Sequence, residues 1–375
     1  AGELRGLELA APRNFKLFPY AISSANRNFT PGSKIDLDRD VGLDAKFGVT
    51  GSLNLDLTYN TDFAQVEVDT QQINLTRYNL RFPEKRPFFL ENAGLFAVGA
   101  SGGGFGGNGD LDLFFSRRIG LDKDGNLVPI KGGARLSGKM NCYNIGLLNM
   151  QTEDVARTPG NNFTTLRVSR DLPSRSGIGA LFINRTATGR FAGAENWNRT
   201  WALDGRLGVG EQWTVGGFAA RTQTPGLGRR QYGWNTTSEY DDGKTLVQFD
   251  YGIIGEDFNP EGGYLENTLG YRRWYVRVQE TMRQEKIRSW GFREFLPHIN
   301  YTRYDYLDGG GLQGGELHAD NHWDWENGFF ISTAVNGTWE GLHEPFEVYP
   351  GIIVPPGDHG GLRFTLRSNT DRRKW

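Results

Sequence analysis

The feature that most constrains the fold is an unbroken alternation of apolar and polar residues in segments of about ten residues. In residues 53–60, Asn54, Asp56, Thr58 and Asn60 alternate with three leucines and a tyrosine. Successive side chains of a β-strand point to opposite faces of a sheet, so this period of two predicts a strand with one apolar and one polar face. Helical periodicity is almost absent. We therefore predict an all-β protein.

These segments recur along the chain at the spacing of an antiparallel sheet. Residues 43–49 alternate in the same way, and the Gly51-Ser52 junction suits a tight hairpin that pairs them with residues 53–60. We count roughly fourteen to sixteen such segments in all. Some of their polar members are predicted to face the inside of the structure together: Asn54, Asp56, Arg135 and Lys139.

Two architectures produce strands of this kind: soluble β-sandwiches and a membrane β-barrel. A sandwich strand alternates because one face packs on a core, whereas a barrel strand alternates because one face meets lipid and the other a polar lumen. Segments of about ten residues match the roughly nine to eleven that cross a bilayer at a tilt. Several tryptophans near strand ends suit the aromatic girdles of a barrel: Trp197, Trp201, Trp213, Trp234, Trp274, Trp323, Trp325 and Trp339. The pattern favours an antiparallel transmembrane-type β-barrel.

Composition excludes several other classes of protein. The mean hydropathy of -0.53 and the lack of a long apolar run exclude a membrane protein built of helices. Lys and Arg number 42 against 44 Asp and Glu, so we expect no basic surface for nucleic acid. The single cysteine, Cys142, cannot form an intrachain disulfide and is interpreted as structural. The sequence from Ala1 onward contains no signal peptide, so we expect any signal peptide to have been removed or to lie upstream.

Residues 62–109 break the alternating pattern. They combine mixed charges, Pro83, Pro87 and a glycine-rich tail, and they are too long for a hairpin turn. The charges cannot rest in hydrocarbon, and large apolar residues such as Phe88 and Phe89 would leave an unusual patch on an external loop. We therefore predict that residues 62–96 lie inside the barrel as a plug or constriction, with an external loop as the alternative.

Several motifs make the resemblance to a family specific. The strings "GLDAKFGVTGSLNLDLTYNT", "FPEKRPFFLE", "FFSRRIG", "GGARLSGK" and "GEDFNPEGGYL" follow one another between about Asp40 and Tyr264. This succession resembles an uncharacterised bacterial outer-membrane β-barrel family, a domain of unknown function usually found after a module like carbohydrate-binding family nine. The resemblance implies a location in the bacterial outer membrane and a lipid bilayer as partner.

The resemblance also implies a domain layout. Residues 1–375 form a single barrel domain, in which residues 1–35 are a linker and first strand and residues 62–110 are the plug or constriction with its glycine-rich loop. Family members carry an N-terminal module and a longer barrel, so we expect the module and the C-terminal strands to be missing here. An incomplete barrel would leave an edge whose backbone groups cannot be satisfied in lipid.

No motif indicates catalysis, a bound metal or a cofactor. The pair His318 and His322 could bind a metal on a helix, but the surrounding sequence is typical of a strand or loop, and we interpret both as solvated loop histidines. Carboxylates at 256, 257 and 261 lie in a string of turn-forming residues and are interpreted as structural. The run "GGGFGGNG" lacks the Lys-Ser or Lys-Thr pair of a phosphate-binding loop.

The function expected from the sequence is an outer-membrane barrel that binds, anchors or passes a polar ligand such as an oligosaccharide or a peptide. The alternatives are a surface carbohydrate-processing hydrolase and a structural barrel that displays an N-terminal carbohydrate-binding module. Candidate ligand contacts lie in the plug: Glu67, Asp69, Arg77, Glu84, Lys85, Arg86, Phe88, Phe89 and Glu91. Candidate residues of the wall and loops lie in the family motifs: Arg117, Arg118, Asp257, Asn259 and Glu261.

Overall fold

The structure is a computed structural model, and it describes residues 15–27, 35–61, 72–99, 110–122, 125–155 and 158–370. One antiparallel sheet of sixteen strands dominates these residues, so the prediction of an all-β protein is confirmed. Its strands, in the order of the sheet, are β1 (Phe15–Arg27), β2 (Ile35–Gly48), β3 (Leu53–Thr61), β5 (Ile130–Met140), β6 (Tyr143–Thr152), β7 (Gly160–Leu172), β8 (Ser176–Thr188), β9 (Trp197–Val209), β10 (Trp213–Gln223), β11 (Tyr232–Asp241), β12 (Thr245–Ile254), β14 (Tyr271–Glu280), β15 (Phe292–Asp305), β16 (Leu312–Trp325), β17 (Phe330–Leu342) and β20 (Gly357–Asn369).

Short elements lie in the connections between these strands. Two pairs of short strands form small sheets, β4 (Leu111–Asp112) with β13 (Tyr264–Leu265) and β18 (Phe346–Tyr349) with β19 (Ile352–Val354). The short helices are α1 (Pro87–Leu90), η1 (Ala93–Phe96), η3 (Ser116–Arg118) and α2 (Glu285–Arg288). Within the described part of the chain, no helix is long and apolar enough to cross a membrane.

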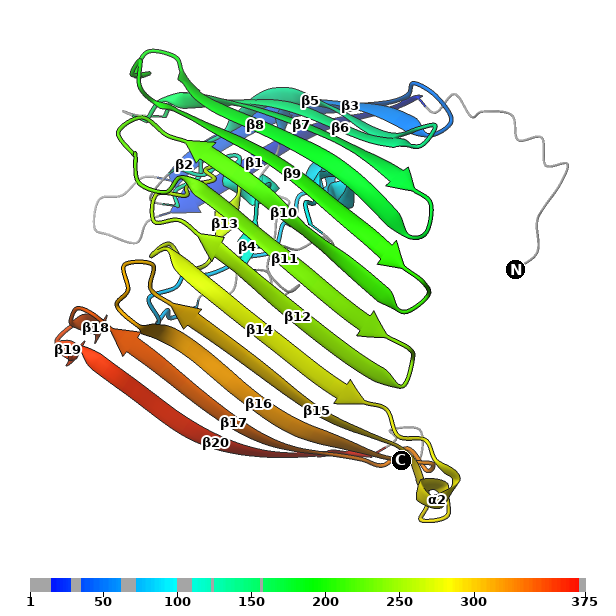
Figure 1. Ribbon diagram of the computed structural model, residues 1–375. Helices are drawn as coiled ribbons and strands as arrows, with labels where there is room; N and C mark the ends of the chain where they lie inside the picture. Colours follow the sequence, from blue (N-terminus) through cyan, green and yellow to red (C-terminus); the bar gives the residue numbers. More distant parts are fainter. Residues whose placement is uncertain are drawn as a thin grey trace, which may run out of the picture.

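The large sheet curves around a hollow that contains β4 and β13 (Figure 1). Every neighbouring pair of strands in it is antiparallel and follows the order of the chain, as in a succession of hairpins. Among the described residues no pairing joins β1 to β20, so the sheet is an open curved wall with two free edges. We call its two sides the concave face and the convex face.

The concave face is buried and holds polar and charged side chains together with the apolar residues of the core, whereas the convex face exposes large apolar side chains. In β9, Asn198 and Thr200 on the concave face are fully buried, while Leu203 on the convex face is 67% exposed. Asp56 and Arg135 are likewise buried on the concave face, which confirms that they face inward. Other large apolar side chains are exposed on the convex face: Ile178, Leu207, Ile299, Leu362, Phe364 and Leu366. This distribution is the reverse of the one found in an ordinary soluble sheet.

The connections differ in length between the two ends of the wall. At one end, which we call the short-turn end, tight turns join the strands at residues 49–52, 141–142, 173–175, 210–212, 242–244 and 326–329, and one longer connection carries α2. At the other end, the long-loop end, the connections include residues 153–159, 189–196, 224–231, 255–270, 306–311 and 343–356. Gly210 and Gly243 adopt positive φ values of 61° and 80° in the tight turns, as primed hairpin turns require.

The core lies between the concave face and the residues that join β3 to β5. We call residues 72–99 and 110–122 the inner segment. Phe89, Phe96 and Ile119 of this segment pack on Leu148 and Met150 of β6. A second cluster joins other residues of the inner segment to β8, β9, β10 and β12: Val98, Leu111, Leu113, Leu181, Ile183, Ala202, Phe218 and Ile254. Of the segment 62–96 predicted to lie inside a barrel, residues 72–96 pack against the concave face of the sheet, and residues 62–71 lie outside the described residues.

Candidate functional site

The motif "FPEKRPFFLE" builds a hydrogen-bonded node within the inner segment. The Glu84 carboxylate accepts hydrogen bonds from Arg86 Nη2 at 2.6 Å, from Ser116 Oγ at 2.7 Å and from the backbone N–H groups of Lys85 and Arg86. Arg86 Nη1 in turn donates to the carbonyl of Ile119 at 2.7 Å. Burial by itself would raise the pKa of Glu84, but the hydrogen bonds and charge of Arg86 together hold that pKa below its ordinary value. The node therefore holds the two halves of the inner segment together.

A second set of contacts anchors the inner segment to β3 and β5. Arg135 Nη2 lies 2.8 Å from Asp56 Oδ2, and the same guanidinium donates to the backbone carbonyls of Phe88 and Glu91. Its carbon lies 5.0 Å from the centre of the Phe88 ring. The Glu91 carboxylate forms a salt bridge with Lys46 of β2. Charge on the wall therefore positions the short helix α1 and Glu91, the residue that follows it.

Arg77 anchors the inner segment to the other side of the hollow. Its guanidinium donates to Tyr306 Oη at 2.8 Å and to the Gly341 carbonyl at 3.2 Å, and it lies 2.8 Å from Glu340 Oε2. It also donates to the backbone carbonyl of Gln313. The inner segment therefore spans the hollow from the strands around β5 to β16 and β17.

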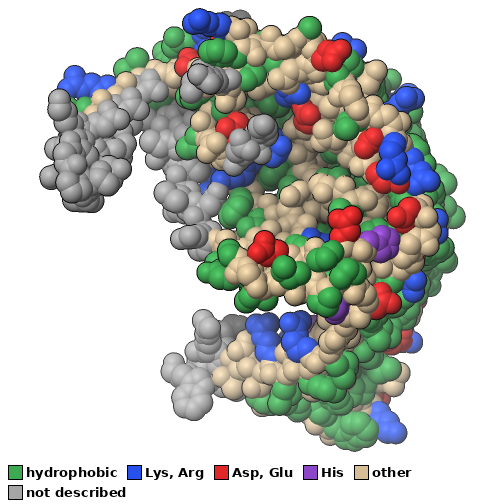
Figure 2. Space-filling view, turned by 90° about the vertical axis from the view of Figure 1, so that its left-hand side faces the viewer, with side chains coloured by type: hydrophobic (Ala, Val, Ile, Leu, Met, Phe, Trp, Pro, Cys, Tyr) green, Lys and Arg blue, Asp and Glu red, His purple; other side chains and the backbone are tan. Residues whose placement is uncertain are grey.

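Two adjoining cavities open between the inner segment and the wall at the long-loop end, where Figure 2 shows a hollow with acidic and basic side chains around it. One has a volume of about 580 Å³ and is lined by Arg118, Leu121, Asn161, Phe163, Arg185, Asn196, Asn259 and Glu261. The other has a volume of about 560 Å³ and adds Phe82, Phe115, Arg117, Glu256, Asp257 and Tyr264. Arg118, Leu121, Asn259 and Glu261 line both. We call the two together the loop-end site.

The connection from β12 to β14 supplies one wall of the loop-end site. Asn198, fully buried in β9, donates to the carbonyl of Asn259 at 2.8 Å, and Asn259 N–H donates to Thr222 Oγ1 at 3.0 Å. Residues 264 and 265 of the same connection pair as β13 with β4 of the inner segment. Asp257 accepts hydrogen bonds from the backbone N–H groups of residues 228 and 229. The string "EDFNPEGG" is therefore an ordered loop, as expected from its turn-forming residues.

Some of the charged side chains in the loop-end site form ion pairs and hydrogen bonds within the protein. Arg185 lies 2.5 Å from Glu261, and its Nη1 donates to Asn161 Oδ1 at 3.0 Å. Arg118 is exposed, and its guanidinium forms no hydrogen bond or ion pair among the described residues. The Glu256 carboxylate pairs with Arg230 through Oε1 at 2.9 Å, whereas its buried Oε2 has no hydrogen-bond partner there. The site thus offers one available guanidinium and one available carboxylate oxygen.

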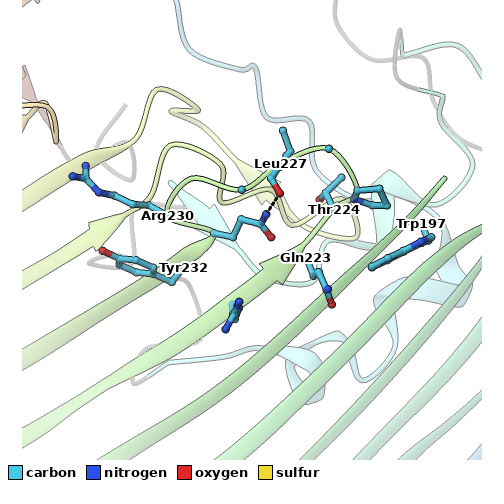
Figure 3. A pocket seen from close by; sticks show the side chains of 11 residues that line it. Trp197, Gln223, Thr224, Leu227, Arg230 and Tyr232 are labelled. Atoms are coloured by element: carbon cyan, nitrogen blue, oxygen red, sulfur yellow. Dashed lines mark hydrogen bonds between the residues drawn. The ribbon is translucent and has the colours of Figure 1, made fainter. Parts of the chain in front are cut away.

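A third cavity, of about 650 Å³, lies at the ends of β9, β10 and β11 beside the connection 224–231. Figure 3 shows it lined by Trp197, Gln223 and Tyr232 under the loop that carries Leu227. Trp197 alternates with the buried Asn198, so its indole lies on the convex side of the wall. This cavity therefore opens on the apolar surface rather than into the hollow.

The structure brings together most of the residues selected from the sequence. Those in the inner segment that the structure describes contact the wall or one another: Arg77, Glu84, Lys85, Arg86, Phe88, Phe89 and Glu91. Those in the family motifs line the loop-end site: Arg117, Arg118, Asp257, Asn259 and Glu261. Glu67 and Asp69 lie outside the described residues. Arg185 and Asn161 were missed. Arg185 shares its face of β8 with the apolar residues Leu181, Ile183 and Ala187, so strand alternation gave no polar signal there.

The interpretation of His318 and His322 as solvated loop histidines is wrong. Both lie in β16, both are half-buried, and both point to the concave face with Asp320. His298 is 20 positions before His318 in the chain, but it lies beside both histidines in the neighbouring strand β15. The error arose because the polar residues around His318 and His322 were not recognised as part of one continuous strand.

Comparison with known families adds one finding to this geometry. Residues 11–157, less than half of the chain, match the family model described as "Domain of unknown function (DUF5916)". This part of the chain is similar to an uncharacterised domain. The match includes "FPEKRPFFLE" and most of the inner segment. No curated protein matches the chain.

Proposed function

We propose that this protein is the wall and inner segment of a bacterial outer-membrane β-barrel that binds a polar ligand, an oligosaccharide or a peptide, in the loop-end site. One observation carries the proposal: the convex face of the sheet exposes large apolar side chains, while the concave face is buried and holds the buried polar and charged side chains of the wall. A sheet with lipid on one side and a filled polar interior on the other has this distribution. Most of the strands have 10 to 14 residues, which is enough to cross a bilayer at a tilt.

The lengths of the connections support an orientation in the membrane. Outer-membrane barrels have short turns on the periplasmic side and longer loops outside the cell. The short-turn end therefore faces the periplasm, and the loop-end site opens to the exterior. A ligand would reach Arg118, on the inner segment, from the exterior.

The chemistry of the loop-end site favours a ligand with hydroxyl, amide or carboxyl groups. The available Arg118 guanidinium donates to oxygen atoms, and the Asn161 and Asn259 amides both donate and accept hydrogen bonds. The rings of Phe82 and Phe115 provide apolar faces beside these groups. Oligosaccharides and peptides combine such polar groups with apolar faces.

Binding is favoured over carbohydrate hydrolysis because two carboxylates of the loop-end site already form contacts within the protein. A glycosidase needs two carboxyl groups facing one another across the substrate. Glu261 is paired with Arg185, and Asp257 is committed to two backbone N–H groups. The third function considered, a purely structural barrel, predicts no ligand at all and is separated from the proposal by the binding experiment below.

Ligand binding is tested with the full chain refolded into phospholipid vesicles. Isothermal titration with panels of neutral and acidic oligosaccharides and of short peptides should identify a binder. Arg118→Ala should weaken its binding about tenfold or more, because a hydrogen bond to a charged group is lost. The matched control is Arg288→Ala, since Arg288 is exposed at the short-turn end and has no hydrogen bond or ion pair among the described residues. Equal loss in both variants, or no binder in either panel, contradicts the proposal.

A further inference from the structure

Three histidines and an aspartate gather on the concave face, away from the loop-end site. His298 of β15 lies directly opposite Asp320 of β16 in the antiparallel register. His318 and His322 lie two residues to either side of Asp320, so strand alternation places all four side chains on one face. None of the four lines the loop-end site.

Three of the separations between the donor atoms are close to those around a tetrahedral metal ion. His298 Nε2 lies 3.2 Å from His318 Nε2, and His322 Nε2 lies 3.2 Å from Asp320 Oδ2. His318 Nε2 is 4.0 Å from the same carboxylate oxygen. Four ligands about 2.0 to 2.1 Å from a zinc ion are separated from one another by roughly 3.4 Å. The donor atoms of His298, Asp320 and His322 all lie within 4.8 Å of one another.

The hydrogen bonds of the imidazoles leave two lone pairs facing each other. His298 Nδ1 lies 3.2 Å from the carbonyl of Leu296, which can only accept, so Nδ1 carries the proton. His318 Nδ1 lies 2.6 Å from Asn336 Oδ1, an arrangement that also places the proton on Nδ1. In the neutral tautomers that these two contacts favour, the lone pairs of both Nε2 atoms face each other. A cation between them converts this repulsion into coordination.

Asp320 supplies a negative charge that its other contacts do not fully neutralise. Its side chain is only 6% exposed. Oδ2 accepts a hydrogen bond from Ser332 Oγ at 2.8 Å, whereas the buried Oδ1 has no hydrogen-bond partner among the described residues. A buried carboxylate oxygen without a partner is costly unless a proton or a metal ion satisfies it.

We propose that His298, His318, His322 and Asp320 form a binding site for a divalent transition metal ion, of which Zn²⁺ fits best. Neutral imidazole nitrogens with one carboxylate are ligands that suit Zn²⁺ better than Mg²⁺ or Ca²⁺. The carbonyl of Leu296 and the Asn336 amide hold two of the rings from outside, as partners of metal-bound histidines do. The His318 and His322 side chains are 25% and 37% exposed, so an ion can reach them from the hollow.

The test is titration of the refolded, metal-free chain with ZnCl₂, in a variant in which Cys142, an exposed thiol, is replaced by Ser. One Zn²⁺ should bind per chain, and Co²⁺ should give the visible absorption of a tetrahedral site. His322→Gln should weaken binding by more than about tenfold, because a ligand is lost. Because the His322 side chain is 37% exposed, against 25% for His318, this variant is expected to fold.

Further variants separate metal binding from a structural role. Asn336→Ala removes a partner of His318 without removing a ligand, and its Zn²⁺ affinity should fall about 10- to 100-fold. The matched control is His359→Ala, because His359 is a partly exposed histidine whose imidazole bonds only to the Pro355 carbonyl among the described residues. Its binding should be unchanged. Failure to bind one Zn²⁺, or equal binding by the His322→Gln variant and its parent, overturns the proposal.

Discussion

Arg135 of β5 and Asp56 of β3 lie directly opposite each other and form a buried ion pair on the concave face, 2.8 Å from Nη2 to Oδ2. The two residues are 79 positions apart in the chain, and the intervening inner segment folds back onto the pair through the carbonyls of Phe88 and Glu91. The pair thus joins the wall to the segment that fills it.

Asp56→Asn should destabilise the protein by about 3 to 5 kcal/mol, because it leaves the buried Arg135 guanidinium without its counter-charge. Urea unfolding in vesicles measures the change. Lys139→Gln is the control, since Lys139 pairs with Asp171 in an exposed position where the cost is about 1 kcal/mol or less. Similar small losses in both variants would show that the pair contributes little.

Leu203→Arg tests whether the convex face meets lipid. Leu203 lies at the middle of β9 and is 67% exposed. In a bilayer the substitution should cost about 2 to 4 kcal/mol near the midplane. On the surface of a soluble sheet it would change stability by only about 0.5 kcal/mol. Folding measured in vesicles distinguishes the two, and Glu211→Arg in the tight turn 210–212 serves as the control outside the membrane.

The lowered pKa of Glu84 predicts how the stability of the inner segment changes in acid. Its folded pKa lies below its ordinary value of 4.5, so the unfolded chain binds its proton more readily. The stabilisation is therefore complete above about pH 5 and is lost as the pH falls through the folded pKa. Glu84→Gln should lower stability at pH 7 and reduce the change in stability between pH 5 and pH 3. An unchanged acid profile would show that other carboxylates dominate.

Cysteine labelling tests the position of the inner segment. Phe89 is 4% exposed and packs on the wall, whereas the adjacent Leu90 is 52% exposed. In a chain carrying Cys142→Ser, Phe89→Cys should react slowly with a bulky maleimide and Leu90→Cys should react rapidly. The neighbours share their sequence context, so a difference in rate reports burial alone. Rapid labelling at both positions would place this part of the segment outside the wall.

Local periodicity was sufficient to predict the strands and the faces of their side chains. It assigned Asp56 and Arg135 to one face, and it could also have placed His318, Asp320 and His322 together, since they occupy alternate positions of one strand. Five residues of the loop-end site, Arg117, Arg118, Asp257, Asn259 and Glu261, were found through their motifs and not through periodicity, because the connection from β12 to β14 has no regular period.

The sequence by itself determined an antiparallel all-β fold whose strands have one polar and one apolar face, because a period of two is a property of neighbouring residues. Only the tertiary structure decided which residues of different segments lie beside each other. It placed His298 opposite Asp320 and Arg185 next to Glu261. The inner segment has no period, and its position depends on packing and ion pairs with residues far along the chain, which no local pattern records.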